Sequence, residues 1–536
     1  MKHTDIIQKL NLEQKCALLS GETVFTTRAL PGKGIPAITL SDGPNGVRKQ
    51  AGAADHLGLN PSVPATCFPT SSATACSWDE KLGEAVGEAL GEEAAAQEVA
   101  VLLGPGLNIQ RSPLCGRDFE YFSEDPILAG RMAAAYVRGI QKNGISACPK
   151  HFAVNSQELR RMASDSVLDE RTLRELYLTG FEIVVKEAKP KTIMTSYNLI
   201  NGTYANENAH LLQDILRKDW GFDGAVVTDW GGSNDHALGV KNGSTLEMPC
   251  PGGDSIRELM KAVQDGKISE ADVDARLDEM LELVLSTHAA VEKAPRTFDA
   301  AAHHKLARRA AAESIVLLRN EGGILPLKPN EKLAVIGDFA ETPRYQGAGS
   351  SAVNALQVDT LLDSIKADDS GITFVGYASG FERQGAADAE KLEEAVALAK
   401  KADTVLLCLG LDELRESEGL DRSDMKLAEN QQQLLAAVAA VNPNVVVLLS
   451  AGAPVETPWV GQCRALVYGA LGGQAGAGAA PAASCPRPGR RLTTTPPPRR
   501  TSAARAGTWS TARACMWATG TIRPPVCRWR SPSATA

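Results

Sequence analysis

The sequence predicts an α/β fold, with an N-terminal (β/α) TIM-like barrel followed by an α/β sandwich domain. Between residues 35 and 250, short apolar runs alternate with amphipathic helical stretches, which is the pattern of a parallel α/β barrel. After residue 330, continuous runs of Val, Ile and Leu alternate with helical stretches, as in a parallel sheet that is covered on both faces. The two observations together favour two α/β units in one chain.

Five apolar runs are the predicted strands of the barrel, at residues 35–40, 99–103, 145–148, 192–196 and 225–228. Helices are predicted between them, for example over 79–97 and 170–189. Each run ends at a polar or Gly/Pro-containing turn, namely SDGPNG, GPGLNI, KHF, YN and DWGG. Because barrels of this kind carry their active sites at the carboxyl ends of the strands, these turns are predicted to lie at the active-site end.

The C-terminal part is predicted to hold strands at 333–336, 373–375, 404–409 and 445–449, with helices over 388–401 and 429–441. Residues 289–305 are rich in Ala and poor in large apolar side chains, which is typical of a linker. The predicted domains are therefore a barrel over 1–288, a linker over 289–310 and a sandwich over 311–480 with an incomplete sheet.

Composition narrows the class of protein. The chain has 536 residues, 43% of them hydrophobic, and a formal net charge of −8, as in ordinary soluble globular proteins. No run approaches the roughly 18 apolar residues of a membrane span, and the first residues lack the apolar segment of a secretory signal. The 11 cysteines are scattered without CxxC pairs, which indicates neither a disulfide framework nor a zinc site. We expect a cytoplasmic protein.

The last 56 residues, 481–536, have a different composition, with ten Arg, nine Pro and no Lys, Asp or Glu. One interpretation is a basic arm for nucleic acid or a membrane surface. The other is translation in a shifted reading frame, and it is favoured because such arms mix Lys with Arg. The genetic code allows the shifted frame to be tested at residues 516–522. If the codons of these residues are read starting at the third base of each, the resulting peptide must begin with Val-Gly, and the code permits Tyr-Arg-Tyr-Tyr to follow. We expect this tail to be out of frame and disordered or non-native.

Asp229 is the first candidate for chemistry, because it directly follows the apolar run of GAVVTDWGG. At that point a carboxylate emerges at the mouth of a barrel. The competing interpretation is a helix N-cap or a salt-bridged loop acid, as most such residues are.

Glu418 is the second candidate, in LGLDELRESEGLDR after the predicted strand 404–409. On composition alone, a flexible acidic surface loop is favoured. Two carboxylates from different loops would indicate a glycosidase if they lie on either side of a bound glycosidic bond. Hydrolysis with retention needs a nucleophile and a proton donor about 5 Å apart.

Other polar side chains follow the predicted strands and are candidates for binding sugar hydroxyls. Taken singly, each is more often an ion-pair partner or a core histidine than a ligand, but several at one barrel mouth make a stronger case. They are Asp42, Arg117, Lys150, His151 and Arg161.

The segments SDGPNGVR, GRDFEYFSEDP, KHFAVNSQELRRM, MTSYN, GFDGAVVTDWGG, RYQGAGSS and ESEGLDR occur in this order. Together they resemble glycoside hydrolase family 3, the β-glucosidase branch, from residue 1 to about 480. The resemblance implies a barrel, an α/β sandwich and commonly a third, fibronectin-type domain. It also implies a retaining exo-glycosidase that acts on terminal β-D-glucosides, needs no cofactor or metal, and has no nucleic-acid or membrane partner.

The resemblance assigns roles residue by residue. Asp229 matches the nucleophile, and Glu418 matches the acid/base supplied by the second domain. We expect neighbouring cations to keep Asp229 ionised and a low-dielectric pocket to raise the pKa of Glu418. The positions that match the lining of the glycone pocket are Asp42, Arg117, Lys150, His151, Arg161, Met194, Tyr197 and Trp230.

Three alternative functions are compared with the β-glucosidase interpretation. An N-acetylglucosaminidase subgroup carries a KHFPGHG-like segment, but this chain has KHFAVNSQE without the second His. A β-xylosidase or arabinosidase remains open, because the pocket around O6 decides between hexose and pentose. A truncated sugar-binding remnant without turnover is the third alternative, and we expect weak activity and poor solubility from the 536-residue chain.

Overall fold

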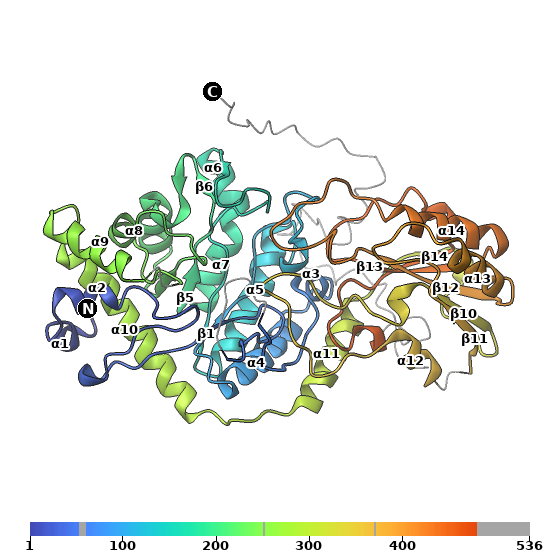
Figure 1. Cartoon of the computed structure of the whole chain (residues 1–536), viewed down its shortest axis with the longest axis horizontal. Helices are drawn as coiled ribbons and strands as arrows, with labels where there is room; N and C mark the ends of the chain where they lie inside the picture. Colours follow the sequence, from blue (N-terminus) through green and yellow to red (C-terminus); the bar gives the residue numbers. More distant parts are fainter. Residues whose placement is uncertain (53–59, 250–251, 369–370, 480–536) are drawn as a thin grey trace, which may run out of the picture.

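The computed structural model of the protein describes residues 1–52, 60–249, 252–368 and 371–479. The predicted tail, 481–536, lies outside these residues. The described chain forms two α/β parts side by side along the long axis of the molecule (Figure 1). Each part has its own cluster of buried apolar side chains, one around the N-terminal strands and one around the C-terminal sheet. The predicted α/β fold in two parts is confirmed.

The N-terminal part is built on short parallel strands. Strands β1 (Leu40–Asp42), β2 (Val101–Leu103) and β3 (Ser146–Ala147) pair in this order, and β5 (Thr192–Met194) pairs with β8 (Ala225–Val227). An isolated parallel bridge between Phe152 and Thr195 joins the two sets. The strands follow one another in sequence order, as in a barrel, but the pairs recorded for the described residues do not close into a complete ring.

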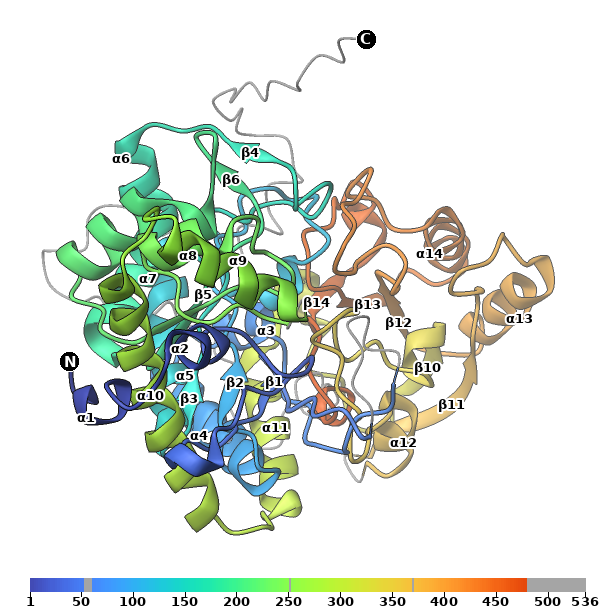
Figure 2. The ribbon, with the colours of Figure 1, turned by 60° about the vertical axis from the view of Figure 1, so that its left-hand side comes forward.

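Helices surround these strands (Figure 2). Helix α4 (Glu80–Ala96) begins at Asp79, whose carboxylate accepts hydrogen bonds from two backbone amides of the first turn, as an N-cap does. It packs against α5 (Pro126–Gln141), where a Cβ at Gly87 would collide with the backbone of Tyr136. The small residue therefore lets the two helix backbones approach closely.

The predicted helix over 170–189 is present in three pieces, α6 (Glu170–Thr172), a π-helical segment (Leu173–Leu178) and α7 (Thr179–Ala188). The remaining N-terminal elements are α1 (Thr4–Ile7), α2 (Leu12–Ala17), α3 (Ser71–Ala75), β4 (Asp165–Ser166), β6 (Leu199–Ile200), β7 (Thr203–Tyr204), a second π-helical segment (His210–Asp219), α8 (His236–Asn242) and α9 (Gly253–Gln264).

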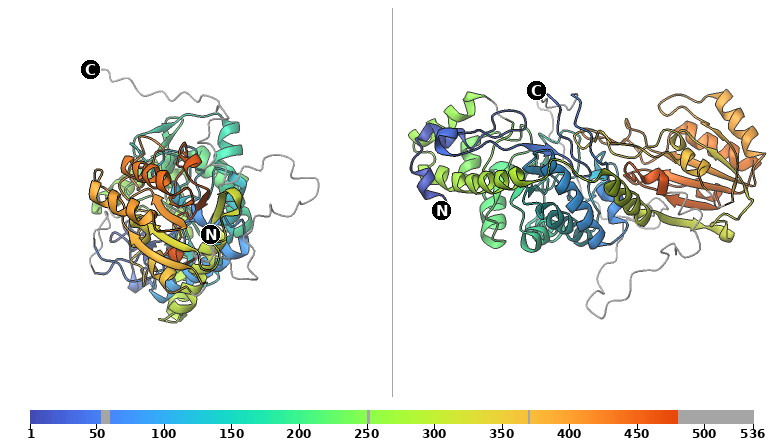
Figure 3. Two further views of the ribbon diagram at one scale, coloured as in Figure 1. Left: turned by 90° about the vertical axis from the view of Figure 1, so that its right-hand side faces the viewer. Right: turned by 90° about the horizontal axis from the view of Figure 1, so that it is seen from below.

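Two helices occupy much of the predicted linker. Helix α10 (Glu270–Lys293) runs along the N-terminal part, and α11 (Ala300–Ser314) leads into the first strand of the C-terminal part (Figure 3). Helix α10 begins with a capping box between Ser269 and Asp272. The Ala-rich composition that suggests a linker is also favourable for helix, which explains the helical structure here.

The C-terminal part is one six-stranded sheet in the order β11-β10-β12-β13-β14-β9. Five strands are parallel, namely β10 (Lys332–Ile336), β11 (Thr373–Ala378), β12 (Thr404–Gly410), β13 (Val445–Ser450) and β14 (Ala465–Tyr468). The sequence did not predict β9 (Val316–Asn320), which pairs antiparallel with β14. Its side chains are half-buried. The helices are α12 (Leu361–Lys366), α13 (Ala389–Ala399) and α14 (Glu429–Val441).

Within the ranges that the structure describes, no helix combines the length and apolar character needed to cross a bilayer.

Candidate active site

Asp229 lies two residues beyond β8, as predicted, and its carboxylate is largely buried. Oδ1 accepts a hydrogen bond from the backbone N–H of Trp230 at 2.8 Å. Oδ2 lies 3.6 Å from Nε2 of His151 and has no hydrogen bond in the described part of the chain. One carboxylate oxygen is thus fixed, while the other is available to an incoming group.

Burial raises the pKa of Asp229 above its ordinary value. The positive charges of Arg161, Arg117 and Lys150 lower the pKa but offset only part of the desolvation. The neighbouring cations thus favour the ionised form of Asp229, as expected, although burial of the carboxylate raises its pKa by more than these charges lower it.

Two aromatic side chains lie beside Asp229. The hydroxyl of Tyr197 donates to the carbonyl of Trp230 at 2.9 Å, and the indole Nε1 of Trp230 donates to the carbonyl of Val24 at 2.8 Å. The centroid of the Phe25 ring lies 5.3 Å from the centroid of the Trp230 ring. Trp230 remains partly exposed, so its position is fixed from one side while part of its surface is open.

Glu120 is a buried carboxylate that the sequence did not lead us to predict, and it contacts the basic residues of the site. Nε of Arg117 donates to Glu120 at 2.6 Å, and Nζ of Lys150 lies 3.2 Å from the same carboxylate. Lys150 also faces Asp42 at 3.8 Å. The i,i+3 spacing of Arg117 and Glu120 in GRDFE was the available signal. The result is two cations and two carboxylates in one buried cluster.

Burial raises the pKa of Asp42 to about 6, although Lys150 acts in the opposite direction. The Asp42 side chain is 17% exposed. It lies at the carboxyl end of β1, the end at which site residues were predicted. A carboxyl that changes charge near this pH can donate or accept hydrogen bonds to a hydroxyl group.

His151 is neutral at ordinary pH, because burial and the charges of Arg117, Lys150 and Arg161 hold its pKa well below the usual range. Its ring Nδ1 lies 3.3 Å from the hydroxyl of Tyr121. A neutral imidazole offers one donor and one acceptor nitrogen.

Glu418 comes from the C-terminal part and contacts two arginines of the N-terminal part. Oε1 accepts from Nη1 of Arg161 at 2.9 Å and lies 3.3 Å from Nη1 of Arg117. Oε2 accepts from the backbone N–H and the hydroxyl of Ser350, at 2.7 and 2.5 Å. The acidic loop is thus held against loops of the N-terminal part and is not the free surface loop that composition alone favoured.

Burial alone would raise the pKa of Glu418. The charges of Arg117 and Arg161 and the hydrogen bonds from Ser350 outweigh it and hold the pKa well below the usual range. The expected rise is therefore wrong for the protein without substrate, since ion pairs to a carboxylate favour its charged form.

Ser350 is the second residue that sequence reasoning missed, although it lies in the RYQGAGSS segment. Gly349 beside it has a φ of +118°, and a Cβ there would collide with the side chain of Glu418. Arg117 reaches the Ser350 hydroxyl as well, at 3.4 Å. A loop of the C-terminal part therefore binds Oε2 of Glu418, while the arginines of the N-terminal part contact Oε1.

The remaining predicted residues fall into two groups. Arg161 stacks over the Tyr197 ring, with its guanidinium carbon 4.9 Å from the ring centroid, and so connects Glu418 to the aromatic side of the site. Met194 ends β5 and is buried in the apolar core of the N-terminal part. Ion pairs, hydrogen bonds and ring contacts thus link the other nine predicted site residues, and Met194 lies in the apolar core beneath them.

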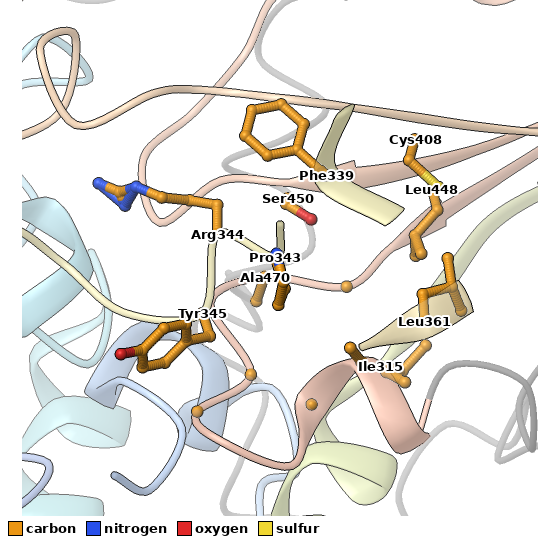
Figure 4. Close-up of a pocket in the computed structure, with 15 residues that line it drawn as sticks. Ile315, Phe339, Pro343, Arg344, Tyr345, Leu361, Cys408, Leu448, Ser450 and Ala470 are labelled. Atoms are coloured by element: carbon orange, nitrogen blue, oxygen red, sulfur yellow. The ribbon is translucent and has the colours of Figure 1, made fainter. Parts of the chain in front are cut away.

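A small cavity lies at the carboxyl edge of the C-terminal sheet (Figure 4). Its volume is about 40 Å³, and Cys408, Leu448 and Ser450 line it together with Arg344 and Tyr345. A space of this size holds one or a few waters, so it is too small for a sugar. Across the described ranges, no three His, Cys, Asp or Glu side chains are grouped to hold a metal ion.

Both parts of the chain match models of known protein families. Residues 49–283 match the Glycosyl hydrolase family 3 N terminal domain, and residues 315–505 match the Glycosyl hydrolase family 3 C-terminal domain. The second match runs past residue 480 into the Arg- and Pro-rich tail.

The chain is 45% identical over 477 residues to thermostable beta-glucosidase B of Acetivibrio thermocellus, covering 88% of this chain and 63% of that protein. It is 44% identical over 482 residues to an exo-alpha-(1->6)-L-arabinopyranosidase of Bifidobacterium longum, with the same coverage of 88% and 63%. The chain thus spans less than two thirds of the length of these relatives.

Among solved structures, beta-glucosidase 3B of Thermotoga neapolitana in complex with glucose superimposes with a TM-score of 0.81 at 32% identity. The match covers 90% of this chain and 74% of that one.

Proposed function

The chain belongs to glycoside hydrolase family 3, and we propose that it is a retaining exo-glycosidase that hydrolyses terminal β-D-glucosides. The observation that carries the proposal is the pairing of two carboxylates from different parts of the fold in one buried network. Asp229 presents an unpartnered oxygen, and Glu418 reaches the same arginine-lined site.

The proposed reaction is a double displacement. Oδ2 of Asp229 attacks the anomeric carbon and forms a glycosyl–enzyme ester, while the bond to the aglycone oxygen breaks and that oxygen takes a proton from Glu418. Glu418 then removes a proton from a water molecule, which attacks the anomeric carbon and releases Asp229. Two inversions give a sugar product with the configuration of the substrate.

The charges around Glu418 support a role for substrate in preparing the acid. Arg117, Arg161 and Ser350 keep Glu418 ionised when no substrate is bound. A bound glycone that takes hydrogen bonds from these arginines would weaken their hold on the carboxylate and let its pKa rise toward the range of a general acid. In this proposal the arginines serve both the sugar and Glu418.

The glycone pocket is proposed to include Asp42, Lys150 and His151. Asp42 can accept hydrogen bonds from two adjacent hydroxyls, and Lys150 supplies donors from within 3.8 Å of Asp42. Trp230, partly exposed, is proposed to stack on the sugar ring, as aromatic faces do with apolar sugar surfaces.

A second candidate is hydrolysis of α-L-arabinopyranosides, favoured by the 44% identity to the Bifidobacterium longum relative. α-L-Arabinopyranose has the ring configuration of β-D-galactopyranose without the hydroxymethyl group, so it differs from β-D-glucose in the orientation of O4 as well as in lacking C6. The space around O4 and O6 therefore decides between the two candidates. The kcat/KM values for nitrophenyl β-D-glucoside and α-L-arabinopyranoside, measured side by side, rank these candidates.

Proton NMR of the first-formed sugar tests the mechanism. A β-glucoside that gives the β-anomer first supports retention, whereas the α-anomer first would exclude the double displacement. Saturable glucose binding without turnover would instead support the sugar-binding remnant.

The remaining expectations belong to the same proposal. The sequence-ordered parallel strands support a TIM-like barrel, with the predicted domains at 1–288 and 311–480. A cytoplasmic location is supported by the seven free cysteines of the described residues, because reducing compartments keep thiols free.

A further inference from the structure

The loop that carries Glu418 is attached to the N-terminal part by a second carboxylate, Asp421. Its Oδ1 accepts from the backbone N–H of Glu158 at 2.9 Å and of Gly116 at 3.3 Å, and its Oδ2 accepts from the N–H of Leu159 at 2.9 Å. One side chain of the C-terminal part thus binds three backbone amides from two loops of the other part.

Glu158 makes the reverse contact. Its buried carboxylate accepts from the backbone N–H of Gly419 at 2.9 Å, and Gly419 directly follows Glu418. The same oxygen accepts from Nη1 of Arg161 at 2.6 Å, and Arg161 in turn contacts Glu418. Each part of the fold therefore contributes one carboxylate that binds backbone amides of the other.

The backbones around these two carboxylates are in close contact. The N–H of Arg422 donates to the carbonyl of Leu114 at 2.7 Å. A Cβ at Gly116 would collide with the carbonyl of Leu420, so this junction admits only glycine at that position. Hydrogen bonds from N–H groups to a carboxylate are stronger than those to a neutral acceptor. The loop that carries Glu418 is therefore held by charge-assisted bonds and by close packing.

We propose that Asp421 and Glu158 are positioning residues that fix the Glu418 loop relative to Asp229 and set the place from which the proton is delivered. The inference rests on the proposed glycosidase function. Asp421 lies three residues after Glu418, and Glu158 lies three residues before Arg161. A displacement of about 1 Å in such a geometry can cost on the order of 10²-fold in rate.

The test compares Asp421→Asn, Glu158→Gln and Glu418→Ala in the full chain. Asp424→Asn is the matched control, because Asp424 is a partly exposed acid of the same loop whose side chain, 42% exposed, lies 3.8 Å from Arg415 and accepts from the backbone N–H of Lys426 within its own loop. An amide in place of Asp421 keeps the size of the side chain but turns an NH₂ group toward backbone N–H donors, so part of the attachment is lost.

Two measurements are made on each variant. The first is kcat/KM for aryl β-glucosides whose phenol leaving groups range from strongly to weakly acidic. The second is hydrogen–deuterium exchange of peptides that contain Gly116, Glu158 to Leu159, and Gly419. A variant that only lowers the folded fraction reduces kcat/KM by the same factor for every substrate, so the leaving-group dependence isolates positioning of the acid.

In Asp421→Asn we expect faster exchange at Gly116 and at Glu158 to Leu159. We also expect a loss on the order of 10²-fold for poor leaving groups, with little change for good ones. Glu158→Gln should show the same kinetic pattern with faster exchange at Gly419, and Glu418→Ala should show a steeper one. Asp424→Asn should match the unsubstituted chain in both measurements.

An equal loss across all leaving groups, or none, in both Asp421→Asn and Glu158→Gln would overturn the positioning role while leaving the glycosidase function intact. If the unsubstituted chain hydrolyses no glycoside, it is the proposed function that fails. In that case the hydrogen–deuterium exchange data alone test whether Asp421 attaches the Glu418 loop to the N-terminal part. Unchanged protection from exchange in Asp421→Asn would refute this attachment.

Discussion

Nη1 of Arg161, on a loop of the N-terminal part, lies 2.9 Å from Oε1 of Glu418 in the C-terminal part. The same guanidinium also lowers the pKa of Asp229. One arginine therefore acts on both carboxylates of the proposed reaction, and its removal has a predictable sign.

Replacing Arg161 with Gln removes a positive charge that stabilises the ionised forms of Asp229 and Glu418. The pKa of both carboxyls should rise, so both limbs of the pH profile of kcat/KM should move to higher pH. Arg160→Gln removes the same charge from the exposed neighbouring residue and should leave the limbs in place. If both limbs of the pH profile stay in place in Arg161→Gln, Arg161 does not control the pKa values of Asp229 and Glu418.

Asp229→Asn should reduce turnover by on the order of 10⁴-fold or more, because an amide cannot form the glycosyl ester. Burial disfavours the charged form of this side chain, so the neutral amide should leave the thermal midpoint unchanged or higher. Activity and thermal unfolding are measured on the same preparation, with the exposed Asp223→Asn as control. Near-normal turnover in Asp229→Asn would remove Asp229 from the nucleophile role.

Gly349→Ala should displace Glu418, because the added Cβ would collide with its side chain and the φ of +118° disfavours a non-glycine residue. We expect kcat/KM to fall on the order of 10²-fold. Gly202→Ala is the matched control, since Gly202 has a φ of +85° and open space around its Cβ position. If both variants lose activity equally, backbone strain and not contact with Glu418 is the cause.

Asp42 has a pKa of about 6 in the folded protein against 3.8 for the ordinary side chain. Because the folded value is raised, Asp42 favours folding below about pH 4 relative to higher pH, and this contribution is lost as pH rises through about 6. The difference corresponds to at most about 3 kcal/mol.

Thermal unfolding at about pH 4 and about pH 7 measures this contribution, with Asp42→Asn compared to the unsubstituted chain. The asparagine variant should lose less stability over this interval, and the exposed Asp5→Asn should behave like the unsubstituted chain. An identical loss in Asp42→Asn would mean that other groups carry the pH dependence.

Four parallel strands of the N-terminal part lie within their predicted apolar runs, whereas β1 (Leu40–Asp42) shares only Leu40 with the predicted run 35–40. Strands β5 and β8 begin at the predicted residues Thr192 and Ala225, and Asp229 follows β8 as expected. Helix α14 covers the predicted residues 429–441. These elements are fixed by local periodicity.

Features that depend on distant partners did not follow from the sequence. Strand β9 is half-buried and gains its pairing from β14, far along the chain. Ser350 reaches Glu418 only through the fold. The low pKa of Glu418 results from two arginines of the other part, and no pattern around ESEGLDR indicates them.

The pairing of β9 with β14 has a consequence for synthesis of the protein on the ribosome. Ala465 of the last described strand lies opposite Asn320 of the first strand of its sheet, so β9 emerges long before β14, the one strand that pairs with it among the described residues. At translation rates of about 5–20 residues per second, the delay is roughly 7–30 s. During that interval the β9 edge is unpaired and open to association with other nascent chains. Chaperone capture of β9 during elongation would therefore limit such association until β14 has been synthesised.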